Sequence, residues 1–181
     1  MLFRSDRIAS TEYKLTILHG ASGVGKSSLV EGGLVPALRQ KAIGTRDNVP
    51  VLIRQYTNWV GAILEELGES PSGIEDVVLE KLRSNEEQNL RTVLIFDQFE
   101  EFFFVQADRA SRQGFYSFLR EAIELSNVKV ILSLREDYLH YLLECRSEMS
   151  MINDGDVLSR DVLYEIGNFS RLDARSIIEE Y

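Results

Sequence analysis

Residues 14–30, KLTILHGASGVGKSSLV, constrain the fold of this chain more than any other segment. They join a short apolar run, a glycine-rich loop and the start of a helical pattern, and residues 20–27 match G-x-x-x-x-G-K-[ST] in full. Glycines let the backbone wrap around an anion, and the N–H groups of the loop and the following helix then point toward it. In such a loop the lysine reaches the β- and γ-phosphates of a nucleotide and the next hydroxyl ligates Mg²⁺. The pattern predicts a nucleotide site formed by Gly20, Ala21, Ser22, Gly23, Val24, Gly25, Lys26, Ser27 and Ser28, with Ser27 as a metal ligand. The plain alternative is a glycine turn before a helix.

Composition narrows the class of protein that can carry this loop. The chain has 181 residues, of which 44% are hydrophobic and 27% charged, so we expect residues 1–181 to form one α/β domain. The net charge is −9 and no basic run stands out, so we do not expect direct nucleic-acid binding, which needs clustered Lys and Arg. The sequence shows no signal peptide and no apolar run of about 18 residues, which predicts no membrane contact and a cytoplasmic location. It stops within an acidic helical pattern, which indicates a segment of a longer multidomain protein.

Apolar runs of strand length alternate with helical patterns along the chain. Strands are expected at residues 15–18, 49–56, 92–96, 128–134 and 161–166. Helices are expected from residue 26 and at residues 36–41, 58–67, 74–85, 112–125, 138–147 and 170–180. Gly32 and Gly33 are interpreted as a break between the first two helices. This alternation predicts a doubly wound α/β fold with a parallel sheet.

Asp97 directly follows the continuous apolar run at residues 92–96, TVLIF. Such a run is typical of a strand buried on both faces of a parallel sheet, and doubly wound sheets bind ligands at the carboxyl ends of their strands. In a fold with a phosphate loop, an acid at this position holds Mg²⁺ directly or through water. Asp97 is therefore a predicted metal ligand. The alternative is that Asp97 caps the next helix.

Glu100 and Glu101 follow Asp97 within one helical turn. Hydrolysis of a phosphoanhydride needs a carboxylate to orient or deprotonate the attacking water, and either acid can lie at the sheet edge. The alternative is a pair of carboxylates favoured by the helix dipole. The sequence does not choose between the two residues.

Arg135 ends the apolar run at residues 128–134, VKVILSL. At the end of a strand beside a phosphate site, an arginine can contact the γ-phosphate. It can equally form a surface ion pair with Glu136 or Asp137. The aromatic string at residues 102–104 is interpreted as core packing rather than a platform for base stacking.

Three strings together resemble the novel-STAND group of P-loop NTPases, which are signal-transducing ATPases with numerous domains related to AAA+ and NACHT proteins. The strings are GASGVGKSSLVEGGLVPALRQ, VLIFDQFEEFF and VILSLREDYL. The signature of the group is a phosphate loop followed by SSLV-x-x-G-L-x-P-A-L, a strand ending in D-Q-F-E-E and a strand ending in L-R-x-D. Close matches span residues 20–39, 94–102 and 130–139, and D-Q-F-E-E is the most specific of them.

This resemblance implies a five-stranded parallel sheet ordered 5-1-4-3-2 and sandwiched by helices. It implies that Lys26 and Ser27 belong to Walker A, that Asp97 is the Walker B acid, that Glu100 and Glu101 are catalytic acids and that Arg135 is sensor 1. In this group the ATPase is usually a switch between a sensor and an effector. Bacterial members resemble antiviral-defence proteins that oligomerise on detecting an invader. The sensor and effector domains are expected outside residues 1–181.

The leading hypothesis is an Mg²⁺-dependent ATPase module that binds ATP and ADP. Its nucleotide state is expected to control assembly with other copies of itself, and turnover is expected to be slow in isolation. The alternative is a nucleotide-loaded scaffold with little or no hydrolysis. Gln98 motivates it, because many related ATPases carry an acid directly after the Walker B Asp. A kinase for a small molecule is a third reading, but the sequence shows no evident acceptor pocket or basic lid.

Overall fold

The computed structural model describes residues 13–40, 46–70, 75–145 and 158–167. Within them, five strands form one sheet in the order β2-β3-β4-β1-β5, and each neighbouring pair is parallel. Read from the other edge, this is the expected order 5-1-4-3-2, so the predicted fold class is confirmed. The strands are β1 (Leu15–Gly20), β2 (Asn48–Ile53), β3 (Arg91–Phe96), β4 (Val128–Arg135) and β5 (Leu163–Glu165).

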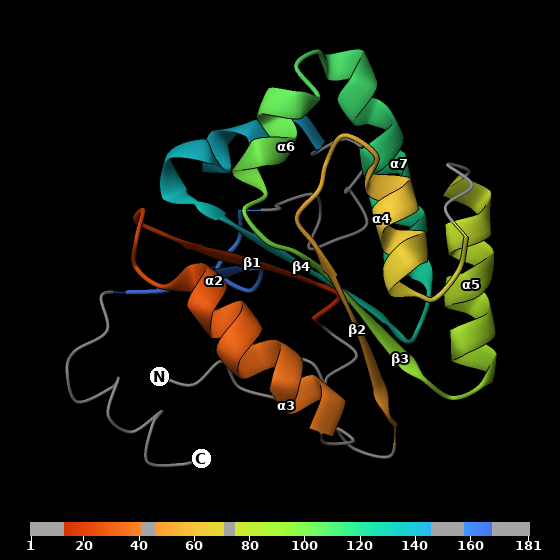
Figure 1. The fold of residues 1–181 in the computed structure, drawn as a ribbon. Coiled ribbons are helices and arrows are strands. Elements are labelled where there is room, and N and C mark those ends of the chain that lie inside the picture. Colours follow the sequence, from red (N-terminus) through yellow and green to blue (C-terminus); the bar gives the residue numbers. More distant parts are fainter. Residues whose placement is uncertain (1–12, 41–45, 71–74, 146–157, 168–181) are drawn as a thin grey trace.

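Helices cover both faces of this sheet (Figure 1). One face carries the run formed by α2 (Lys26–Leu29), η1 (Val30–Leu34) and α3 (Val35–Gln40). The other carries α4 (Trp59–Glu66), α5 (Glu75–Glu87) and α7 (Arg109–Glu124). The short helix α6 (Glu100–Val105) follows β3, and the 3₁₀ helix η2 (Glu136–Cys145) follows β4.

The core consists of two apolar clusters, one on each face of the sheet. On β3, Val93 and Ile95 belong to the cluster under the α2–α3 run, whereas Leu94 and Phe96 belong to the cluster under α4, α5 and α7. This division follows from the two-residue repeat of a strand. All six residues of β3 are buried; the apolar run at residues 92–96 predicts this for five of them, whereas burial of Arg91 was not expected.

The predicted helix break at Gly32 and Gly33 is wrong. Both glycines lie within η1, a π-helical turn that connects α2 to α3 without interruption. Val30, Leu34 and Leu38 are buried against the sheet, and this burial holds the helix together through a pair of residues with poor helix propensity. The unbroken run leaves Glu31 exposed beside the site described below.

Other element boundaries differ from the sequence expectation in smaller ways. The segment after β4 is a 3₁₀ helix that starts at Glu136, not an α-helix from residue 138. The last strand is three residues long. Of the aromatic string, Phe102 and Phe103 are buried, which confirms core packing there, whereas Phe104 is 58% exposed. The helix expected at residues 170–180 lies outside the described residues.

Lys129 is buried near the amino end of β4, opposite the edge where the strands end. Its Nζ donates to the carbonyl oxygen of Tyr13 at 2.8 Å. Burial, with the nearby cations Lys14 and Arg91, lowers the pKa of Lys129 from 10.5 to about 8. Between those values the unfolded chain binds a proton at this position that the folded chain does not.

We therefore expect the free energy of unfolding to rise with pH between about 8 and 10.5 because of Lys129. The contribution is at most about 1.4 kcal/mol per pH unit. Urea unfolding of the wild type and of Lys129→Met over this pH range measures this contribution. It is the difference between the two proteins in the slope of the free energy of unfolding against pH. Parallel pH profiles for the two proteins would show that Lys129 keeps its ordinary pKa in the fold.

Candidate functional site

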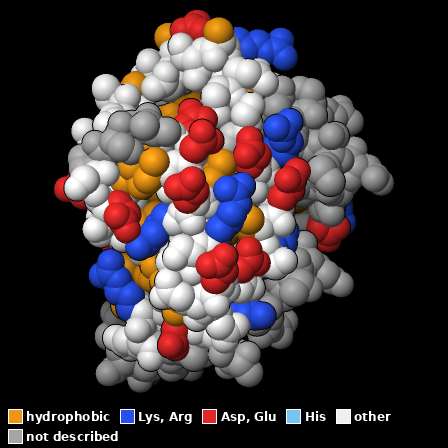
Figure 2. Space-filling view, turned by 90° about the vertical axis from the view of Figure 1, so that its right-hand side faces the viewer, with side chains coloured by type: hydrophobic (Ala, Val, Ile, Leu, Met, Phe, Trp, Pro, Cys, Tyr) orange, Lys and Arg blue, Asp and Glu red, His pale blue; other side chains and the backbone are white. Residues whose placement is uncertain are grey.

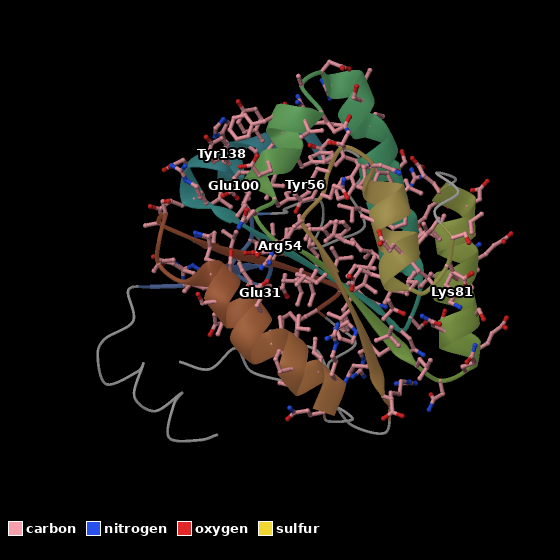
Figure 3. The ribbon with its side chains drawn as sticks, viewed as in Figure 1. Glu31, Arg54, Tyr56, Lys81, Glu100 and Tyr138 are labelled. Carbon is pink, nitrogen blue, oxygen red and sulfur yellow. The ribbon has the colours of Figure 1, made fainter. Side chains whose placement is uncertain are left out.

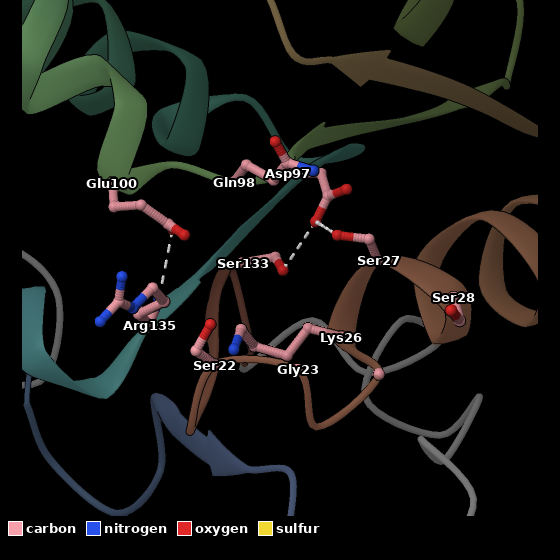
Figure 4. Close-up of a pocket in the computed structure, with 11 residues that line it drawn as sticks. Ser22, Gly23, Lys26, Ser27, Ser28, Asp97, Gln98, Glu100, Ser133 and Arg135 are labelled. Carbon is pink, nitrogen blue, oxygen red and sulfur yellow. Dashed lines mark hydrogen bonds between the residues drawn. The ribbon is translucent and has the colours of Figure 1, made fainter.

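The carboxyl ends of β1, β3 and β4 lie together at one edge of the sheet and surround a cavity of about 310 Å³. The cavity is lined by Ser22, Gly23, Gly25, Lys26, Ser27, Ser28, Asp97, Gln98, Glu100, Ser133 and Arg135 (Figure 4). Most of the predicted site residues therefore come together in space. The exceptions are Gly20, Ala21, Val24 and Glu101, which do not line it.

The glycine-rich loop connects β1 to α2 and has the backbone conformation that its sequence predicts. Gly23 and Gly25 have φ angles of 77° and 97°, in the left-handed region that favours glycine. Gly25 is the N-cap of α2. The first N–H groups of a helix have no intrahelical acceptor, so those of Lys26, Ser27 and Ser28 are available to an anion in the cavity. Val24 instead packs against the apolar cluster beneath the α2–α3 run.

Gly20 has a steric role at the end of β1. A Cβ added there would lie 2.6 Å from the carbonyl oxygen of Ile166, closer than atoms can approach without a backbone shift. Ile166 in turn donates its N–H to the carbonyl oxygen of His19 at 2.7 Å. The backbone directly after β5 therefore lies in close contact with the first residue of the phosphate loop.

We expect Gly20→Ala to lower the free energy of unfolding by about 1–3 kcal/mol, because backbone must move to admit the methyl group. Gly32→Ala is the matched control, since an added Cβ there meets nothing within 4 Å and helix propensity favours alanine by up to about 1 kcal/mol. Chemical denaturation of both variants makes the comparison. Equal stability of the two would contradict the steric account of Gly20.

Lys26 lies over the loop that precedes it. Its Nζ donates to the carbonyl oxygens of Gly20 and Ala21, both at 2.8 Å. Burial lowers the pKa of Lys26, and the nearby Glu100 carboxylate opposes this effect. The ammonium is thus held at the mouth of the loop by two neutral acceptors, which a phosphate oxygen could replace with a stronger, charge-assisted partner.

Asp97 is wholly buried at the end of β3. Its Oδ1 accepts from the Ser27 hydroxyl at 3.2 Å and from the Ser133 hydroxyl at 2.9 Å (Figure 4). The alternative that Asp97 caps the next helix is wrong, because the N-cap of α6 is Phe99 and no side chain caps that helix. The phosphate loop and Asp97, about 70 residues apart in sequence, are thus joined by a direct hydrogen bond.

The donor atoms at this position fit a hard divalent cation. A hydroxyl and a carboxylate in hydrogen-bond contact offer oxygen ligands, which Mg²⁺ prefers. Among the residues that the structure describes, no group of three or more His, Cys, Asp and Glu side chains could hold a metal ion by itself. A hydroxyl and a carboxylate are ligands of the kind that can hold Mg²⁺ together with substrate phosphates.

Two site residues just after β2 were missed from the sequence. Arg54 donates from Nε and Nη2 to Oδ2 of Asp97, at 3.0 and 2.8 Å, and from Nη1 to Glu31. The Tyr56 hydroxyl donates to the backbone carbonyl of Asp97 at 2.7 Å. The available signal was their position at the carboxyl end of a strand, where α/β sheets place ligand-binding side chains. Ser133 was missed as well, although it is a polar residue within an apolar strand.

The backbone turns sharply after Asp97. Gln98 has a φ angle of 54°, and the N–H of Phe99 donates to the Ser133 carbonyl at 2.8 Å. A left-handed conformation is uncommon for a residue other than glycine, and such strain gathers at functional sites. The turn brings the first residues of α6 back toward the cavity.

Glu100 and Glu101 are placed differently by this turn. Glu100 lines the cavity, and its Oε2 accepts from the backbone N–H of Arg135 at 3.3 Å. Glu101 is exposed and does not line the cavity. The geometry thus separates two acids that the sequence left equivalent.

Arg135 also lines the cavity, but its guanidinium pairs with Asp137 at 2.6 Å and lies over the Tyr138 ring, 5.4 Å from the centroid. The ion pair that the sequence offered as an alternative is therefore present. Contact with a γ-phosphate stays a prediction; only Nη2 of the guanidinium pairs with Asp137.

The sheet order, the phosphate loop and the strand-end acid define the fold of a P-loop NTPase. Residues 5–180 match the family model described as Novel STAND NTPase 1, and the chain belongs to this family. It thus contains a nucleotide-binding NTPase module. Comparison with the sequences of curated proteins gave no match.

Solved structures of two archaeal proteins share the fold. The ORC2 protein of Aeropyrum pernix, determined as ADPNP-ADP complexes, matches with a TM-score of 0.65 at 14% identity, over 97% of this chain and 48% of that one. The ORC1 protein of the same organism, in complex with DNA, matches with a TM-score of 0.63 at 14% identity, over 97% and 46%. This chain spans about half the length of the structures it matches, and at this identity the likeness concerns the fold alone.

Proposed function

We propose that this chain is an Mg²⁺-dependent ATP-binding and ATP-hydrolysing module, with the site residues named from the sequence except Glu101. The observation that carries the proposal is the cavity in which Lys26, the Ser27–Asp97 pair and Glu100 converge from the phosphate loop, β3 and α6. The ADPNP-ADP complexes of the Aeropyrum pernix ORC2 protein support adenine nucleotides as ligands.

The residues of the cavity would have different roles in phosphoryl transfer to water. The N–H groups at the start of α2 bind phosphate oxygens, and the Lys26 ammonium exchanges the Gly20 and Ala21 carbonyls for the β- and γ-phosphates. Ser27 and Asp97 would hold Mg²⁺, which neutralises charge on the phosphates when bound. Glu100, opposite the loop, orients the attacking water and accepts its proton.

Turnover as a function of protein concentration tests this function. We expect phosphate release from ATP by the wild type that exceeds the Lys26→Ala background and grows faster than linearly with concentration, because a second copy can supply a charge-stabilising arginine. Nucleotide bound without turnover at every concentration would favour the alternative, a nucleotide-loaded scaffold. Gln98 motivates that alternative, since it stands directly after Asp97 where many related ATPases carry an acid.

The wider role extends beyond the residues present here. We propose that residues 1–181 are one STAND-type domain of a longer protein, and that its nucleotide state controls oligomerisation in signalling or antiviral defence. The family supports this role, and the sensor and effector would lie in other domains. Size-exclusion chromatography with light scattering, in ATP and in ADP, tests the link between nucleotide and assembly.

Direct nucleic-acid binding stays unexpected for this segment. The net charge is −9, and Figure 2 shows acidic and basic side chains interspersed on one face, without a block of basic ones. The Aeropyrum pernix ORC1 protein was solved with DNA, so a gel-shift assay is the appropriate check.

Within the described residues no helix is long and apolar enough to cross a membrane. A cytoplasmic location stays a prediction.

A further inference from the structure

Arg54 occupies the position from which a cation can reach the buried acid of the site. It follows Ile53, the last residue of β2, and Ile53 is aligned with Phe96 of β3. The N–H of Asp97 donates to the Ile53 carbonyl at 2.9 Å, so the backbones at the ends of β2 and β3 remain paired up to this point. The strand register therefore sets Arg54 directly beside Asp97.

The hydrogen bonds of Asp97 use both of its carboxylate oxygens. Oδ1 accepts from two hydroxyls, Ser27 and Ser133, and Oδ2 accepts from two nitrogens of Arg54. Asp97 is 0% exposed, and a buried carboxylate is stabilised by a nearby positive charge and by hydrogen-bond donors. In this arrangement the Arg54 guanidinium supplies that charge.

Arg54 has a second acidic partner, on the side of the guanidinium that faces away from Asp97. Its Nη1 pairs with Glu31, which lies on the π-helical turn η1 after the phosphate loop. The side chains of Arg54 and Glu31 are 34% and 52% exposed, so the guanidinium lies between a buried acid and a solvent-facing one. Figure 3 shows the two side chains next to each other between β2 and the helix run. A guanidinium displaced from Asp97 would still be paired.

We propose that Arg54 competes with a divalent cation for the carboxylate of Asp97. In the nucleotide-free protein the guanidinium neutralises the buried carboxylate. A cation that arrives with nucleotide takes over this role, and Arg54 then remains with Glu31. The inference rests on the proposed metal site, and it adds a residue that sets how strongly metal binding depends on nucleotide.

Binding of Mn²⁺ to the nucleotide-free protein tests the competition without any measurement of turnover. The probe is the paramagnetic signal of free Mn²⁺, titrated into wild type and variants. We expect Arg54→Gln to bind Mn²⁺ about tenfold more tightly than the wild type, because a competing cation and two charge-assisted hydrogen bonds are gone. Arg54→Lys keeps the charge but loses the forked donor, so it should show a smaller gain.

Glu31→Gln should change the affinity in the opposite direction. Without the Glu31 carboxylate, displaced Arg54 has no second partner, so Mn²⁺ binding should weaken several-fold. Because Glu31 is exposed, this variant is expected to fold even if Arg54→Gln does not. Arg83→Gln, on the exposed side of α5, is the matched control and should bind Mn²⁺ as the wild type does.

Two results separate this inference from the function on which it rests. Asp97→Asn should remove the tight Mn²⁺ site in every background, and tight binding that survives it would refute the metal site itself. Unchanged Mn²⁺ affinity in Arg54→Gln, Arg54→Lys and Glu31→Gln, with nucleotide binding by the wild type intact, would overturn the role of Arg54 alone.

Discussion

Lys26→Ala is expected to weaken the binding of Mg·ATP at least about tenfold and to reduce turnover to background. The Lys26 ammonium already lies within the phosphate loop, held by the carbonyls of Gly20 and Ala21. Its hydrogen bonds to phosphate would be charge-assisted and would form in a partly buried site, where they are stronger than in water. Titration with a fluorescent ATP analogue measures the change in dissociation constant.

Lys81→Ala is the matched control for the loss of one lysine. Lys81 lies on α5 and pairs with the exposed Glu69 at 2.6 Å, away from the cavity (Figure 3). Its replacement should leave ATP binding unchanged. If Lys26→Ala bound ATP as tightly as Lys81→Ala, the phosphate loop would not be the nucleotide site. Thermal unfolding of both variants verifies that a loss of binding does not come from a loss of fold.

Glu100→Gln is expected to lower the turnover number by about 10²–10⁴-fold, because glutamine can position water but cannot accept its proton. Glu100 faces the cavity from the first turn of α6, and its carboxylate is held by the backbone N–H of Arg135. Binding of ATP should be preserved, since the substitution leaves the phosphate loop and Asp97 in place. Single-turnover kinetics, with protein in excess over ATP, measures the hydrolytic step separately from product release.

The neighbouring acid provides the control. Glu101→Gln removes the same charge from the same helical turn, but Glu101 is exposed and outside the cavity lining. Its turnover should remain within about twofold of the wild type, as for other surface substitutions. A large loss in Glu101→Gln, with Glu100→Gln near normal, would reverse the assignment of the base.

The strands, the phosphate loop and Asp97 could be predicted because each depends on local sequence. The left-handed backbone of the phosphate loop requires glycines, and residues 92–96 of β3 form a continuous apolar run directly before Asp97. The sheet order came from the resemblance to novel-STAND NTPases, since strand order depends on contacts between distant segments that periodicity does not report.

What the sequence did not reveal depends on such distant contacts. Arg54 and Asp97 are 43 residues apart, and only the pairing of β2 with β3 brings them together. Which of Glu100 and Glu101 faces the cavity depends on the left-handed turn at Gln98, which no glycine marks. The unbroken helix through Gly32 and Gly33 reflects burial of neighbouring side chains, which outweighs the low helix propensity of glycine.

Native mass spectrometry of the protein mixed with ATP and Mg²⁺ tests the central claim most directly, because it identifies the bound nucleotide and its fate in one experiment. We predict that the wild type carries ATP that is converted to ADP over time, that Glu100→Gln carries ATP that persists, and that Lys26→Ala carries little nucleotide. A wild type that binds no adenine nucleotide would contradict the account. A wild type that retains ATP as long as Glu100→Gln does would contradict the claim that this module hydrolyses it.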